Sequence, residues 1–167
     1  MRKLGLLLGT VAVAALAWTA GFNAVAAGSS KQEITDLEHK CIAATSTDQA
    51  ASLGCFDEND IVLYDFVPPL KYAGDKAVRG DLDNFFNNAK NVKGEFVELQ
   101  VVTDGKLGVA RSIQHFTWTS KDGKPMEATL RVTDVLHKAD GKWKVFHTHV
   151  SVPVNPDTGK AEMNLKS

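Results

Sequence analysis

The sequence predicts an α+β fold in which three N-terminal helices pack on a strongly curved, mostly antiparallel sheet. In the first half, apolar residues recur at a helical spacing. The second half holds four long segments rich in β-branched and aromatic residues, separated by short turns that contain glycine. Because helices and strands are segregated along the chain rather than alternating, we expect the helices to lie together on one side of the sheet.

Three segments predict helices. Residues 31–44 carry apolar side chains close to a helical period. Asp48 is a good N-cap for a second helix that runs through Phe56, and Asp75 is a good N-cap for a third. The buried side of the third helix is expected to carry Ala77, Val78, Leu82, Phe85 and Phe86.

The other segments predict strands. A short strand at residues 61–66 is bounded by Asn59–Asp60 and Pro68–Pro69. Longer strands are expected at residues 95–103, 109–119, 128–137 and 143–152. The turns between them contain Asp104–Gly105, Asp122–Gly123 and Asp140–Gly141, which are typical of hairpins.

Residues 1–26 have the pattern of a secretory signal peptide. Arg2 and Lys3 precede an uncharged run, and Ala24–Val25–Ala26 supplies the small residues that a signal peptidase requires. We expect cleavage, with retention as a membrane anchor as the alternative. The mature chain would then be one periplasmic or secreted domain over residues 27–167, without a membrane segment.

Composition and motifs exclude several classes of function. The net charge is −1 and the sequence has no basic stripe, so we expect no nucleic-acid partner. The sequence has no glycine-rich phosphate loop, Gly-x-Ser-x-Gly elbow or Cys-x-x-Cys pair, and we expect no cofactor.

Cys41 and Cys55 are the two cysteines of the sequence. In an exported chain they favour a disulfide between neighbouring helices. Closing a loop of this length would stabilise the fold by about 3 kcal/mol. The alternative is a pair of buried free thiols.

The last predicted strand contains two histidines, His147 and His149. Strict alternation places them on one face with Trp143, Val145 and Ser151, and places Phe146, Val150 and Val152 on the other. In the neighbouring strand, Arg131 and Thr133 would lie beside the histidines. We expect Arg131, His147 and His149 to bind a ligand in a pocket, with structural histidines as the alternative. A zinc site with His115 or Asp65 lacks a ligand-spacing signature, so we expect no metal.

Asp65 ends the short predicted strand. It could hydrogen-bond the turn before the prolines. If it faces an apolar pocket instead, burial would raise its pKa and make it a general base, with His115 or His147 as its proton partner. Tyr64 would then face the other side. Tyr72 and Trp118 are candidate aromatic walls of the pocket.

The stretch "FDENDIVLYDFVPPLKYAGDKAVRG" resembles the corresponding region of SnoaL-like and ketosteroid-isomerase-like proteins of the NTF2-like superfamily. The stretch "DGKWKVFHTHVSVP" is similar to the terminal hairpin of SnoaL-like domains and of the calmodulin-dependent kinase II association domain. The resemblance implies a cone-shaped fold that encloses a pocket, and a homodimer through the outer sheet face. It does not imply one activity, because this fold supports many.

Residue by residue, the resemblance places Asp65 where ketosteroid isomerases have their catalytic base. Cys41 occupies the position of their oxyanion-binding tyrosine. Thr133 lies nearest to their protonated acid, with Asp134 one residue away and expected on the other face. These differences argue against steroid isomerisation.

Two functions remain. The first is an exported protein that binds a small organic ligand, anionic or carbonyl-bearing, in the pocket. The second is a cofactor-independent acid/base enzyme that uses Asp65 and a pocket histidine.

Overall fold

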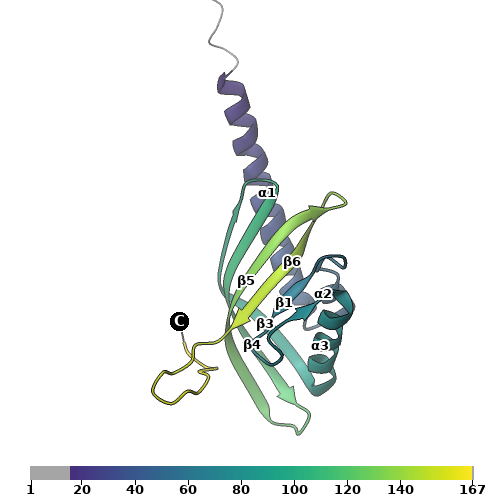
Figure 1. Cartoon of the computed structure of the whole chain (residues 1–167), viewed down its shortest axis with the longest axis vertical. Coiled ribbons are helices and arrows are strands. Elements are labelled where there is room, and N and C mark those ends of the chain that lie inside the picture. Colours follow the sequence, from purple (N-terminus) through teal and green to yellow (C-terminus); the bar gives the residue numbers. More distant parts are fainter. Residues whose placement is uncertain (1–15, 167) are drawn as a thin grey trace, which may run out of the picture.

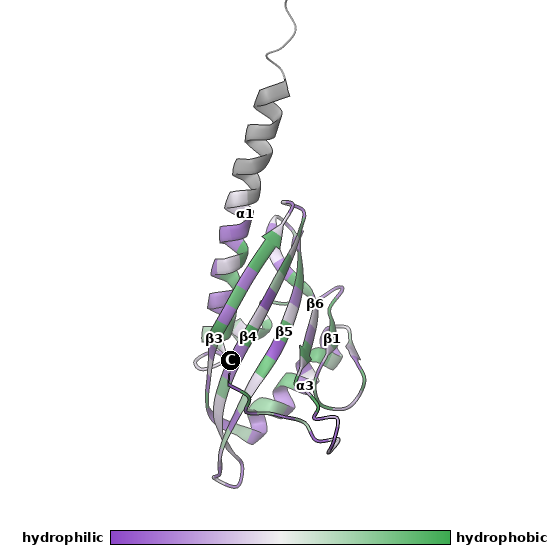
Figure 2. Cartoon of the chain, turned by 90° about the vertical axis from the view of Figure 1, so that its left-hand side faces the viewer, coloured by the Kyte–Doolittle hydropathy of each residue, from purple (hydrophilic) through white to green (hydrophobic). Residues whose placement is uncertain are grey.

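The computed structural model describes residues 16–166 and has three helices on one side of a six-stranded sheet (Figures 1 and 2). The helices are α1 (Leu16–Ala44), α2 (Gln49–Leu53) and α3 (Asp75–Asn88). Asp48 caps α2 as predicted, since its side chain accepts a hydrogen bond from the Ala51 N–H at 3.0 Å. The prediction for α3 was wrong by one residue. Gly74 is the N-cap, and Asp75 lies in the first turn, where its carboxylate binds Arg79 at 2.7 Å.

The strands are β1 (Val62–Tyr64), β2 (Tyr72–Ala73), β3 (Ala89–Thr103), β4 (Leu107–Ser120), β5 (Pro125–Ala139) and β6 (Lys142–Ser151). Strands β3, β4 and β5 extend beyond the predicted segments, whereas β1 is shorter than predicted, β6 is shifted by one residue and β2 was not predicted. Their order is β2-β1-β6-β5-β4-β3, and every pair is antiparallel except β1 with β6. Gly105, Gly123 and Gly141 adopt positive φ in the three turns of β3–β6, which confirms the predicted hairpins. The α+β prediction is therefore confirmed.

Helix α1 packs across the inner face of the sheet. Ile34 is fully buried, and a Cβ at Gly108 of β4 would overlap with its Cδ1 atom. Glu33 accepts a hydrogen bond from Trp143 Nε1 at 2.8 Å and pairs with Lys138 at 3.1 Å. The close approach at Gly108 and the contacts of Glu33 fix the position of α1 against β4, β5 and β6.

Cys41 and Cys55 form the predicted disulfide, with their Cα atoms 6.1 Å apart. Cys41 lies in the last turn of α1, and Cys55 follows α2. The bond joins the end of α1 to the segment that enters β1.

Strand β6 contains a bulge at Phe146. Val135 of β5 lies opposite His147, but the next residue, Leu136, lies opposite Val145, so Phe146 is an extra residue on β6. One extra residue reverses which side chains face the helices. Trp143 and Val145 are buried before the bulge, and Thr148 is buried after it.

The predicted faces of β6 are therefore wrong beyond Phe146. His147 and His149 do not share the inner face of Trp143 and Val145. Val150 and Val152, expected on the outer face, pack on the inner cluster of Ala128, Leu130 and Val132.

The predicted signal peptide lies partly outside the described residues. Residues 16–26 belong to α1, while residues 1–15 are not described. Among residues 16–166, no helix combines the length and hydrophobicity needed to span a membrane.

Candidate functional site

A cavity of about 530 Å³ lies between the inner face of the sheet, the end of α1 and α3. Its volume is within the range of small-molecule sites. Aromatic side chains supply much of the wall: Phe56, Phe66, Phe85, Phe86, Phe96, Phe116 and Trp118. Leu130, Val132, Val145 and Val150 line it from β5 and β6. The site is thus mainly apolar, with a small number of polar groups.

The C-terminal segment contributes to the wall. After β6 the chain turns back, and the Thr129 N–H donates to the Met163 carbonyl at 2.6 Å. Met163 packs against the inner cluster of β5 and lines the cavity. Figure 1 shows this segment below the end of β6.

Asp65 lines the cavity immediately after β1. Burial raises its pKa to about 6, and the neighbouring carboxylate of Asp81 acts in the same direction. The Phe66 N–H donates to Asp65 Oδ1 at 2.7 Å. Asp65 therefore combines the two predicted environments, because it binds the turn backbone and faces the cavity. Tyr64 lies on the opposite face, as expected, and is 41% exposed.

Glu38 of α1 and Asp134 of β5 form a buried acidic pair in the same cavity, with exposed fractions of 5% and 7%. Burial and the charge of Asp134 raise the pKa of Glu38 to about 9. Burial also raises the pKa of Asp134, although the hydrogen bond from the Thr148 side chain opposes that rise. Glu38 Oε1 has no hydrogen-bond partner among the described residues.

The ionisable side chains that line the cavity are all acids. They are Glu38, Asp65, Asp81 and Asp134. Within the described part of the chain, no lysine, arginine or histidine lines it.

The predicted cluster of Arg131, Thr133, His147 and His149 exists, but on the outer face. Thr133 lies opposite His149, and Arg131 is exposed on the same face of β5. The Tyr64 ring lies 4.8 Å from the His147 ring and 5.9 Å from the His149 ring. His147 Nδ1 is 3.0 Å from the Val62 carbonyl oxygen, an interaction with the backbone of the neighbouring strand. The expectation that Arg131, His147 and His149 face the pocket is therefore wrong.

The other predicted site residues are divided between locations. Trp118 lines the cavity, where its ring lies 5.8 Å from Phe85. His115 does not line it, and its Nδ1 is 3.4 Å from Thr129 Oγ1.

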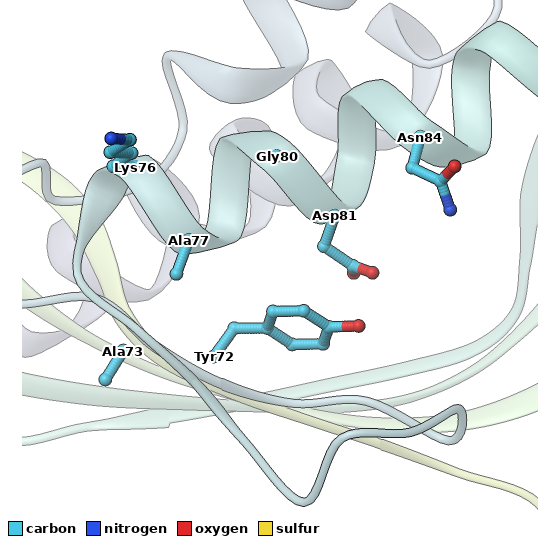
Figure 3. A pocket seen from close by; sticks show the side chains of 7 residues that line it. All are labelled: Tyr72, Ala73, Lys76, Ala77, Gly80, Asp81 and Asn84. Atoms are coloured by element: carbon cyan, nitrogen blue, oxygen red, sulfur yellow. The ribbon is translucent and has the colours of Figure 1, made fainter.

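Tyr72 lines a separate open groove of about 600 Å³ between β2 and α3 (Figure 3). Its hydroxyl donates to the Pro68 carbonyl at 3.0 Å. Asp81 projects from α3 toward the Tyr72 ring in Figure 3 and lines both the groove and the cavity.

Three acids of the cavity, Glu38, Asp81 and Asp134, were missed by the sequence interpretation, although a pattern marks Glu38 and Asp134. Glu38 lies four residues after Ile34 and four before Ile42, on the buried stripe of α1. Asp134 continues the alternation of Leu130 and Val132, which face inward. A carboxylate on an otherwise apolar face is the signal that could have found them. The expectation that Asp134 faces away from the pocket was wrong.

A family model for the SnoaL-like domain matches residues 34–155, which include all four cavity acids. The chain belongs to the SnoaL-like domain family. Members of this family include ligand-binding proteins and cofactor-independent enzymes. No curated protein matches the sequence of this SnoaL-like domain protein.

Solved structures confirm the NTF2-like fold of the SnoaL-like domain. An NTF2-like protein of unknown function from Pseudomonas putida KT2440 has a TM-score of 0.74 at 23% identity, over 84% of this chain and 98% of that one. A ketosteroid isomerase-like protein from Erwinia carotovora atroseptica SCRI1043 has a TM-score of 0.62 at 21% identity, over 72% and 94%. A Xanthomonas campestris protein assigned to the calcium/calmodulin-dependent protein kinase II association domain has a TM-score of 0.63 at 26% identity, over 71% and 84%.

The histidines, cysteines and acids of the described SnoaL-like domain do not form a metal-binding group of three or more. The chemistry that its cavity offers is that of carboxyl groups in an apolar environment.

Proposed function

We propose that this SnoaL-like domain binds a small, largely apolar organic molecule in the cavity between its sheet and helices. The observation that carries the proposal is the cavity of about 530 Å³, with aromatic and aliphatic walls and a few polar groups. Its charged groups are acids, which favour a neutral or cationic ligand over the anionic one expected from Arg131 and the histidines.

Nile red, a neutral apolar dye, tests this binding. We expect its fluorescence to increase on addition of the protein, and we expect Leu130→Trp to reduce this binding at least tenfold by filling the cavity. Leu130 lines the cavity, whereas its neighbour Arg131 is exposed, so Arg131→Trp is the matched control. Thermal unfolding of both variants shows whether they are folded. Equal binding by two folded variants would contradict the cavity as the site.

Asp65 favours a second function, acid/base catalysis without a cofactor. With its pKa raised to about 6, Asp65 is a carboxylate at neutral pH and a stronger base than an exposed aspartate. Because neither His115 nor His147 lines the cavity, the acid partner in this proposal is protonated Glu38, which could donate a hydrogen bond to a carbonyl oxygen.

Exchange of the α-protons of 2-decalone in D₂O, followed by NMR, tests this activity. If Asp65 takes up a proton from carbon, Asp65→Asn should lower the catalysed exchange rate by about a hundredfold or more. Asp48→Asn, at the exposed α2 cap, provides the control. If the unmodified protein does not raise the exchange rate above the uncatalysed rate, the catalytic function is contradicted and only the binding function remains.

We also propose that the chain is exported and that one domain begins near Ala27. The basic and apolar pattern of residues 1–26 supports this, and the disulfide is compatible with an oxidising compartment. N-terminal sequencing of protein recovered from a periplasmic extract is the test. A start at Met1 would contradict cleavage.

A further inference from the structure

The acidic side chains of the cavity indicate the charge of its ligand, in addition to the apolar character proposed above. This inference rests on the proposed binding function. Four acids, Glu38, Asp65, Asp81 and Asp134, line the cavity, and within the described residues no basic side chain lines it. Two of them, Glu38 and Asp134, are more than nine-tenths buried, one on α1 and one on β5. An anion placed among these groups would be repelled by the ionised carboxylates, and no basic side chain of the described residues lines the cavity to offset that repulsion.

Glu38 provides a second, independent observation. Its Oε1 atom is buried and has no partner in the described chain, although buried polar atoms are hydrogen-bonded in most folded proteins. Glu38 lines the cavity, so a ligand there can supply the missing partner. Because Asp134 lies beside it, a donor with more than one N–H could bind both carboxyl groups.

The aromatic walls of the cavity also favour a cationic ligand. Phe96 and Phe116 line it from β3 and β4, and Trp118 lines it further along β4. Aromatic faces attract organic cations through their quadrupole, and this attraction is strongest where water is excluded. Carboxylates combined with aromatic walls therefore favour a positively charged group on an apolar skeleton.

We propose that the cavity binds a small apolar amine, with its ammonium group against Glu38 and Asp134 and its carbon skeleton against the aromatic walls. The two carboxyl groups supply the counter-charge and hydrogen-bond acceptors. The aromatic side chains supply the apolar contact area and select for a hydrophobic rather than a hydrated cation.

Binding of such an amine is linked to proton release. Before the amine binds, burial and the charge of Asp134 keep Glu38 protonated at neutral pH. The other titratable groups around the cavity, Asp65 on the β1 side and Asp81 on α3, are also acids, while the Cys41–Cys55 sulfurs do not titrate. An ammonium group beside Glu38 favours its ionised form, so the carboxyl proton leaves as the amine binds.

A matched ligand series tests the inference. The probes are 1-adamantylamine, 1-adamantanol and 1-adamantanecarboxylate, which share one skeleton and differ in charge. At pH 7, calorimetry should show the amine binding at least tenfold more tightly than the alcohol, and the carboxylate most weakly. Titrations in buffers of different ionisation enthalpy should show proton release with the amine and none with the alcohol.

Two variants test whether the preference for the amine depends on Glu38 and Asp134. Glu38→Gln and Asp134→Asn each keep the size of the side chain, and each should lower the affinity for the amine at least tenfold while changing that for the alcohol less than threefold. Glu127→Gln, on the exposed part of β5, is the control. If the alcohol binds as tightly as the amine, the amine inference is wrong and the binding function stands. If none of the three probes binds, the binding function is contradicted as well.

Discussion

His137 Nε2 lies 2.5 Å from Asp57 Oδ2, and this contact joins strand β5 to the loop that follows α2. Asp57 is 6% exposed and also accepts a hydrogen bond from the Asn59 N–H at 2.9 Å. The Asn59 backbone and then His137 hold the pKa of Asp57 below its usual value. The side of the fold around Asp57 therefore depends on an ionised carboxylate.

Asp57→Asn should lower the free energy of unfolding at pH 7 by about 1.5–3 kcal/mol, the usual contribution of a hydrogen bond to a charged group. Because the pKa of Asp57 is lower in the folded state, its stabilisation is present above the ordinary value of 3.8 and is lost as pH falls through the folded value. Urea unfolding at pH 7 and at pH 3 measures this. Asp60→Asn in the same loop is the control. If Asp57→Asn lowers the free energy of unfolding equally at both pH values, the ionised contact between Asp57 and His137 is contradicted.

The disulfide should contribute strongly to stability. Replacing both Cys41 and Cys55 by serine removes a link that closes a loop with a sequence separation of 14. The chain-entropy relation gives a loss of about 3 kcal/mol. Chemical denaturation of the double variant measures the loss, and reduction of the unmodified protein should reproduce it. Unchanged stability in both experiments would show that the link constrains the unfolded chain little.

Glu38 should make stability depend on pH in the opposite sense to Asp57. Its pKa is raised from 4.5 to about 9 in the folded state, so its favourable contribution is present below 4.5 and is lost as pH rises through about 9. Glu38→Gln removes this titration. Thermal unfolding should therefore show the variant gaining stability relative to the unmodified protein between pH 5 and pH 9. If the difference in stability between the variant and the unmodified protein stays constant from pH 5 to pH 9, Glu38 is already ionised at pH 5.

Gly108 should be intolerant of any side chain. A Cβ at this position would overlap with Ile34 of α1, and the Trp143 ring lies 3.6 Å away. We expect Gly108→Ala to destabilise the fold by about 1–3 kcal/mol, the usual effect of overpacking. At Gly80 of α3, an added methyl group would have nothing within 4 Å, so Gly80→Ala should instead stabilise by about 0.5–1 kcal/mol. Denaturation midpoints that shift in the same direction would contradict the close packing of α1.

The outer sheet face should form the homodimer interface that the family resemblance implies. The bulge at Phe146 changes the residues that carry this prediction, because it places His147 and His149 on that face beside Tyr64. Light scattering should give the mass of a dimer, and His149→Glu should shift it toward the monomer through repulsion between the two copies. Lys142→Glu, at the β5–β6 turn, is the control. A monomeric mass for the unmodified protein would contradict the predicted homodimer.

Local sequence signals predicted most helices and strands of this protein, but not the short strand β2. Asp48 has a carboxylate that can cap a helix, and Gly105, Gly123 and Gly141 tolerate the positive φ of tight turns. Both properties act within a few residues, so they are readable without knowledge of the fold. The expectation of export and the cysteine count led to the predicted disulfide, and the order of helices and strands led to the predicted α+β fold.

Tertiary structure decided which side chains meet in the cavity. The bulge at Phe146 moved His147 and His149 to the outer face, and a single extra residue leaves no mark in an alternating sequence. Glu38 and Asp134 lie 96 residues apart in the sequence, and their shared burial depends on how α1 packs on the sheet. The sequence could therefore supply the acids and the aromatic residues, but only the packing of α1 on the curved sheet brought them together, because face and burial are properties of the whole fold.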